Sequence, residues 1–158
     1  MFLWFVVLSV VIVAVVFRSP AIDHRTVIVG SLLPLVEAAL GGPRLLHSVV
    51  GAVGLLGLVM VATRGRRLLR RRLLGVPIGM MCHLVLDGAF TRTDVFWWPV
   101  AGLDFAAGQI PEIDHLVLSV VLEVVAVGVG IWAWRMFGLE DPAKRERFRT
   151  QGRLDLPS

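Results

Sequence analysis

The feature that most constrains the fold is a long apolar run at residues 116–137, LVLSVVLEVVAVGVGIWAWRMF, in which only Glu123 and Arg135 are charged. As a helix rising ~1.5 Å per residue, this run can cross the ~30 Å hydrocarbon core of a bilayer. The whole chain shares this character, because 56% of its 158 residues are hydrophobic and 18% are charged. Soluble domains contain about 45–50% apolar and about 25% charged residues. The sequence therefore predicts a membrane protein with one domain.

Shorter apolar runs precede this one and predict further membrane helices. The expected membrane segments are about 2–17, 26–40, 47–63, 73–90 and 116–137. The predicted fold class is all-α, a polytopic membrane domain of about five helical segments over residues 1–138, followed by a basic tail over 139–158. Segment 26–40 contains Gly30 and Pro34 and is the one expected to be broken or re-entrant. The first segment lacks a basic start and a small-residue cleavage site, which predicts a retained anchor.

The basic residues gather on one side of this predicted arrangement. With five crossings, all of the 16 Lys and Arg residues except Arg44 and Arg92 fall on the side that holds loop 64–72 and residues 144–153. The positive-inside rule then places the N-terminus outside and the C-terminus in the cytoplasm. The sequence pI of about 10.9 is thus interpreted as membrane orientation. No nucleic-acid partner is expected, and the expected partner is the lipid bilayer of a cell membrane crossed several times.

Histidines and acids gather on the opposite, extracytoplasmic side. His83 and Asp87 are four residues apart, so on a helix they project from one face. An imidazole nitrogen and a carboxylate oxygen on adjacent turns can bind one metal ion. His47 and Glu37, on neighbouring predicted helices, could complete the ligand set. Mixed nitrogen and oxygen ligands suit a divalent metal such as Zn, with Mn or Fe as alternatives.

Each of these residues also has a simpler structural interpretation. A His–Asp pair on a helix is often a buried hydrogen bond that holds two helices together, and Glu37 could be a carboxylate that reaches water. Bis-histidine haem ligation by His47 and His83 is a further alternative. Glu123 is interpreted as a hydrogen-bond partner between helices. Three glycines of the third segment predict close helix packing: Gly51, Gly54 and Gly57.

At the same residues the chain resembles a bacterial family of inner-membrane-associated metal-dependent hydrolases. The matching pieces are GSLLPLVE (30–37), RLLHSVVG (44–51), GMMCHLVLDG (79–88) and FWWPVAG (96–102). They occur in the family's order and cover roughly residues 23–102, about half of the chain. One departure is Leu35, because the family often has an aspartate directly after the proline. A carboxylate that a two-metal site would use is absent there.

The resemblance implies a metal site with His47, His83 and Asp87 as the matching ligands and with Glu37 as the acid three places after Pro34. It also implies a hydrolase in the bacterial inner membrane, acting on an ester, phosphoester or amide of a lipid or envelope substrate. Two candidates for a catalytic general base lie in the outer loop: Asp114 and His115. The alternative function is a non-enzymatic membrane scaffold or regulator, a degenerate family member in which the His, Asp and Glu side chains serve helix packing.

Overall fold

The computed structural model describes residues 1–19, 21–41, 45–91, 93–100 and 116–155. Within these ranges every regular element is helical, as the sequence predicts. The α-helices are α1 (Phe2–Phe17), α2 (His24–Gly41), α3 (Val49–Ala62), α4 (Arg67–Leu73), α5 (Gly75–Leu86), α6 (Thr93–Phe96), α8 (Leu116–Met136) and α9 (Pro142–Gln151). Two short 3-10 helices, η1 (Leu45–His47) and η2 (Ala89–Thr91), follow α2 and α5.

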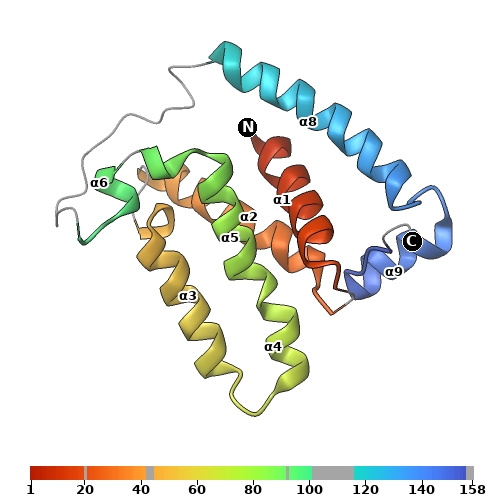
Figure 1. The fold of residues 1–158 in the computed structure, drawn as a ribbon, viewed down its shortest axis with the longest axis horizontal. Helices are drawn as coiled ribbons and strands as arrows, with labels where there is room; N and C mark the ends of the chain where they lie inside the picture. The colour runs from red at the N-terminus through yellow and green to blue at the C-terminus, as the bar shows by residue number, and fades with distance from the viewer. Residues whose placement is uncertain (20, 42–44, 92, 101–115, 156–158) are drawn as a thin grey trace.

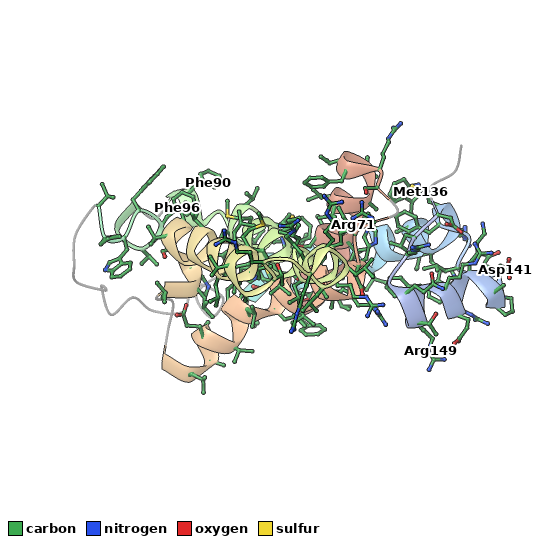
Figure 2. The ribbon with its side chains drawn as sticks, turned by 90° about the horizontal axis from the view of Figure 1, so that it is seen from below. Arg71, Phe90, Phe96, Met136, Asp141 and Arg149 are labelled. Atoms are coloured by element: carbon green, nitrogen blue, oxygen red, sulfur yellow. The ribbon has the colours of Figure 1, made fainter. Side chains whose placement is uncertain are left out.

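Helices α2 and α5 lie side by side at the centre of the molecule, and the other helices surround this pair (Figure 1). Helix α3 packs on α5, and a small apolar cluster fills the space between them. Helix α1 contacts α2, α5 and α8, so it separates α8 from the central pair. Phe90 and Phe96 lie at one end of the long axis, and Met136, Asp141 and Arg149 lie at the other (Figure 2). The candidate ligands of the sequence analysis therefore belong to the central pair and to η1.

Three glycines allow the backbones of α2 and α5 to touch. A Cβ on Gly79 would overlap the Val27 carbonyl oxygen, and one on Gly30 would overlap the Val76 carbonyl oxygen. On Gly75 a Cβ would meet the Thr26 hydroxyl. Small residues at such crossings let helices approach closely enough for backbone contact. The α2–α5 crossing is therefore fixed by the absence of side chains at these positions.

The glycines singled out in α3 behave differently. A Cβ on Gly54 or Gly57 would meet no atom of the described residues within 4 Å. Only Gly51 is close to its surroundings, where a Cβ would overlap the Leu45 carbonyl oxygen of η1. The prediction of close helix packing is therefore wrong for Gly54 and Gly57, because these two glycines lie on an open face of α3.

The prediction of about five membrane-spanning segments is wrong. Within the described residues, only α8 is both long and apolar enough to cross a membrane. The apolar helices α1 and α3 have 16 and 14 residues, which at ~1.5 Å per residue reach only ~24 Å and ~21 Å of the ~30 Å needed. The predicted orientation of the termini depended on five crossings and does not survive this correction.

The two remaining segments fail for different reasons. Helix α2 has 18 residues, but it carries His24, Arg25 and Glu37, which reduce its apolar character. Pro34 lies inside α2 without ending it, so the expected break in segment 26–40 is absent. Segment 73–90 begins at the last residue of α4, and its central helix α5 has 12 residues. An apolar run in the sequence thus overstates the length of the helix that it contains.

The tail returns to the start of α2 and is held there by hydrogen bonds. The backbone N–H of His24 and its ring Nδ1 both donate to the Gly152 carbonyl oxygen, at 2.9 and 3.0 Å. Arg25 donates to the Arg149 carbonyl oxygen at 2.7 Å and pairs with Asp23. Gly152 adopts a left-handed conformation with φ 67°, and a Cβ there would overlap the Asp23 carboxylate. We call this contact between the start of α2 and the end of α9 the tail clasp.

Burial and hydrogen bonds set the ionisation of the clasp. Burial lowers the pKa of His24, and the hydrogen bond to Gly152 offsets this in part. Burial raises the pKa of Asp23, but the hydrogen bonds and the charge of Arg25 outweigh it, so this pKa lies below its usual value. The His24 Nε2 atom is buried and has no hydrogen-bond partner within the described residues. The clasp therefore holds His24 as a neutral imidazole.

Candidate metal site

Glu37 and His47 form one half of the candidate site. Glu37 lies in the last part of α2, and its two carboxylate oxygens accept the backbone N–H of Leu46 at 3.0 Å. The same carboxylate accepts the Nδ1–H of His47 at 3.1 Å. Ser48 then caps α3, because its hydroxyl accepts the Gly51 N–H. Glu37 thus positions both the short η1 turn and the imidazole that this turn carries.

His83 forms the other half and lies at the centre of the molecule. Its side chain is almost fully buried, and its Nδ1 lies 2.7 Å from the Ser31 carbonyl oxygen of α2. A carbonyl oxygen only accepts hydrogen bonds, so Nδ1 carries the proton. The Phe5 ring of α1 stacks on the imidazole, with ring centroids 3.9 Å apart. Three helices therefore fix the orientation of this side chain.

The two imidazoles lie next to each other and share a protonation pattern. Their ring centroids are 5.7 Å apart, and the rings meet edge to face. Each Nδ1–H donates to a protein acceptor, so in each neutral ring Nε2 is the nitrogen that carries no proton. Metal-ligating histidines almost always donate their other ring N–H to a carboxylate or a backbone carbonyl. The donor chemistry of His47 and His83 thus fits a transition-metal ion.

The described residues do not complete a ligand set. No group of three His, Cys, Asp or Glu side chains among them is close enough to hold a metal ion. Asp87 follows the last residue of α5, and its backbone N–H donates to the His83 carbonyl oxygen at 2.8 Å. It thus lies one turn beyond His83, as its spacing predicts. Asp114 and His115, the candidate general bases, lie outside the described residues.

Cys82, the neighbour of His83, adds no anionic ligand. Burial raises the pKa of its thiol, which favours the protonated form. Thiolates, and not thiols, bind metals. The ligand chemistry at this site is therefore that of histidine and carboxylate.

Sequence reasoning missed the groups that orient His83. The Ser31 carbonyl is a backbone group that no motif marks, and Phe5 is one apolar residue in an apolar helix. A usable pattern did exist in GVPIG (75–79), where Gly75 and Gly79 are four residues apart, the spacing of closely packed membrane helices. That pattern predicts a helix lying directly against α5, and α2 occupies this position.

Glu123 behaves as the sequence predicts. Its carboxylate oxygens accept the backbone N–H of Leu3 at 3.1 and 3.0 Å, and one lies 3.4 Å from the N-terminal amine. The residue therefore links α8 to the start of α1, where the helix dipole also favours a negative charge. It forms no group of three metal-binding side chains among the described residues.

The chain was also compared with known protein families, with curated proteins and with solved structures. No family model, no curated protein and no solved structure matches it. The hydrolase resemblance stated from the sequence motifs therefore stays a prediction.

Proposed function

We propose that this chain is a membrane-associated metal-dependent hydrolase whose site is built on His47 and His83. The observation that carries the proposal is that both imidazoles donate Nδ1–H to fixed protein acceptors and have Nε2 as their unprotonated nitrogen. The two rings are adjacent and come from separate elements, η1 and α5. This arrangement supports binding of Zn, with Mn or Fe as alternatives.

The protein groups around the rings have separate roles in this proposal. Glu37 fixes the tautomer of His47, and the Ser31 carbonyl fixes that of His83. Phe5 covers one face of His83 and excludes water from it. Asp87 follows one turn beyond His83 and stays a predicted ligand, since it forms no group of three with the two rings among the described residues. A bound divalent cation would polarise the bond to be cleaved and activate a water molecule.

The proposed substrate is an ester, phosphoester or amide in a lipid or envelope molecule. Helix α8 supports this, because it is long and apolar enough to cross a membrane. Only 11% of its most apolar stretch of 18 residues is buried within the described structure. A chain anchored by such a helix meets substrates at the membrane surface. The proposed location is accordingly a cell membrane, with α8 as the anchor.

The experiment is elemental analysis of the full chain purified in detergent. Wild type is expected to hold close to one equivalent of Zn, Mn or Fe, and His47→Ala and His83→Ala are expected to lose it. His24→Asn is the matched control, because His24 is buried in the tail clasp and is not a candidate ligand. Its replacement is expected to leave the metal content unchanged. Glu37→Gln is expected to weaken metal affinity about 10–100-fold. Wild type without metal, or metal unchanged in both alanine variants, would contradict the proposal.

Hydrolase activity needs its own measurement. Chromogenic esters and phosphoesters are expected to be cleaved by wild type, to resist cleavage after chelation, and to be cleaved again when the metal is returned. An absorbance scan of the same sample tests the haem alternative, since a bis-histidine haem has a strong visible band. Cleavage that persists in His83→Ala would assign the activity to a contaminant.

A second candidate function is a non-enzymatic membrane scaffold. The specific observation in its favour is that a hydrogen bond from His83 to the Ser31 carbonyl joins α5 to α2. Glycines bring the backbones of these two helices into contact at the same crossing. Under this hypothesis His83→Ala lowers the melting temperature and leaves the metal content of the protein unchanged. The elemental analysis above therefore separates the two functions in one experiment.

A further inference from the structure

The boundary between α1 and α8 contains two adjoining hollows. Their volumes are about 450 and about 300 Å³, and Val7, Gly130 and Trp134 line both. Ligand cavities commonly measure about 300–1,000 Å³. Apart from Arg135 and Glu140, all lining residues are apolar or glycine. The two hollows together form what we call the α1–α8 groove.

Gly130 forms part of the wall of this groove. A Cβ there would lie 3.7–3.8 Å from the methyl groups of Val7, which is ordinary contact. A longer side chain at this position would reduce the space of the hollows that Gly130 lines. Gly128, two residues earlier on α8, has no described atom within 4 Å of a would-be Cβ. A leucine in place of Gly130 would therefore fill the groove, whereas a leucine in place of Gly128 would leave the groove open.

The ends of the groove differ in charge. At the start of α1, Glu123 compensates the N-terminal amine. At the other end, Arg135 is exposed and makes no ion pair within the described residues. Lys144 lies against Gly138 just beyond α8, and Glu140 lines the same hollow as Arg135. The Arg135 end therefore has two basic groups, Arg135 and Lys144, against the one acidic group of Glu140.

The apolar walls also need a cover. Ile131 and Trp134 on α8 line the groove and are 54% and 43% exposed, and only 11% of the most apolar stretch of α8 is buried within the described residues. Exposed apolar surface costs roughly 25 cal/mol per Å² in water. A hydrocarbon chain along the groove removes this cost, and an anionic phosphate at its end meets Arg135.

We propose that the α1–α8 groove binds one acyl chain of an anionic phospholipid, with the phosphate at Arg135 and Lys144. The site is separate from the histidines and does not depend on a bound metal. It assigns α1, Gly130 and the start of the tail a shared role in holding one lipid molecule.

The test uses the full chain purified in detergent and titrated with phosphatidylglycerol or phosphatidylcholine, with thermal stabilisation as the readout. Wild type is expected to bind phosphatidylglycerol more tightly. Gly130→Leu fills the groove and is expected to lower the affinity for both lipids at least tenfold, whereas Gly128→Leu leaves it unchanged. Arg135→Gln is expected to reduce the preference for phosphatidylglycerol about fivefold, the contribution of one basic residue near lipid phosphate.

Several outcomes would overturn the proposal. Equal lipid affinity in Gly130→Leu and Gly128→Leu would mean that the groove holds no acyl chain. Stabilisation by glycerol phosphate as strong as by phosphatidylglycerol would assign the effect to a headgroup site without a chain. If Gly130→Leu fails to fold, Val127→Trp fills the first hollow from a position that is 47% exposed. Unchanged affinity in that variant would equally contradict the proposal.

Discussion

Helices α2 and α5 meet with backbone contact at three glycines, whereas α8 touches α1 along one side and leaves most of its surface exposed. The central pair also contains the buried polar groups His83 and Ser31, which hydrogen-bond to each other. Helix α8 contains Glu123, which bonds to the start of α1. The comparison teaches that protein contacts hold the central pair together, while most of the surface of α8 is uncovered by the residues that the structure describes.

The strongest test of this comparison places the same side chain in both regions. Gly79→Leu forces a side chain into the Val27 carbonyl and is expected to destabilise the protein by at least about 3 kcal/mol. Gly128→Leu adds the same side chain to the open face of α8 and is expected to change stability by less than about 1 kcal/mol. Unfolding in detergent, followed by tryptophan fluorescence, measures both. Equal effects would mean that the central pair is no more tightly packed than α8.

Glu37→Gln tests the polar part of the central region. The carboxylate accepts the Leu46 N–H and the His47 Nδ1–H, and an amide replaces one of its acceptor oxygens with a donor. The expected loss of stability is about 1–3 kcal/mol. Glu146→Gln on the exposed face of α9 is the control and is expected to change nothing measurable. Thermal melting of the two variants gives the comparison, and similar melting temperatures would contradict it.

The pH dependence tests the tail clasp, which joins the end of α9 to the central region. Burial lowers the pKa of His24 in the folded state below 6.5, so the unfolded chain binds more protons when the pH falls below that value. The pKa of Asp23 is also lowered, but its contribution is lost only below 3.8. The melting temperature is therefore expected to fall by a few degrees between pH 7.5 and pH 5.5.

His24→Asn is the matched variant for this pH experiment. Its amide can donate to the Gly152 carbonyl oxygen in place of Nδ1, but it does not titrate. The difference in melting temperature between pH 7.5 and pH 5.5 is expected to shrink in this variant. An unchanged difference would assign the pH dependence to groups other than His24.

The smallest expected effect concerns Ser9 on α1. Its hydroxyl is fully buried and has no hydrogen-bond partner within the described residues. Ser9→Ala removes this polar group and is expected to stabilise the protein by about 0.5–1 kcal/mol. Ser31→Ala is the contrast, because that hydroxyl donates to the Ile28 carbonyl and its loss is expected to be neutral or destabilising. Chemical denaturation of both variants decides the sign.

The sequence predicted the helices better than their role. Apolar runs located α1, α3 and α8, because an apolar run predicts a helix whether protein or lipid covers its side chains. The same runs gave too many membrane spans, since hydropathy does not distinguish burial against protein from burial in lipid. His83 and Phe5 illustrate this. Each belongs to an apolar segment that was predicted to cross the membrane, and each is buried by neighbouring helices.

The candidate site was predicted in part. The grouping of Glu37, His47 and His83 follows from residue type and order, and the structure places the first two in a hydrogen bond and the two rings side by side. The role of Glu37 as a hydrogen-bond acceptor for His47 could not be predicted. It depends on the η1 turn, which places the His47 ring beside the Glu37 carboxylate. Backbone acceptors such as the Ser31 carbonyl leave no trace in a sequence.

The tail clasp also imposes an order on the making of this protein. His24 and Gly152 are 128 residues apart in the chain, so a ribosome has released all of α8 before Gly152 can reach His24. Until then the Gly152 carbonyl cannot accept the two hydrogen bonds that His24 donates in the folded chain. The contacts among α1, α2 and α5 involve only residues 2–86, so they can form before the clasp closes. Its closure therefore follows the synthesis of α8 and α9.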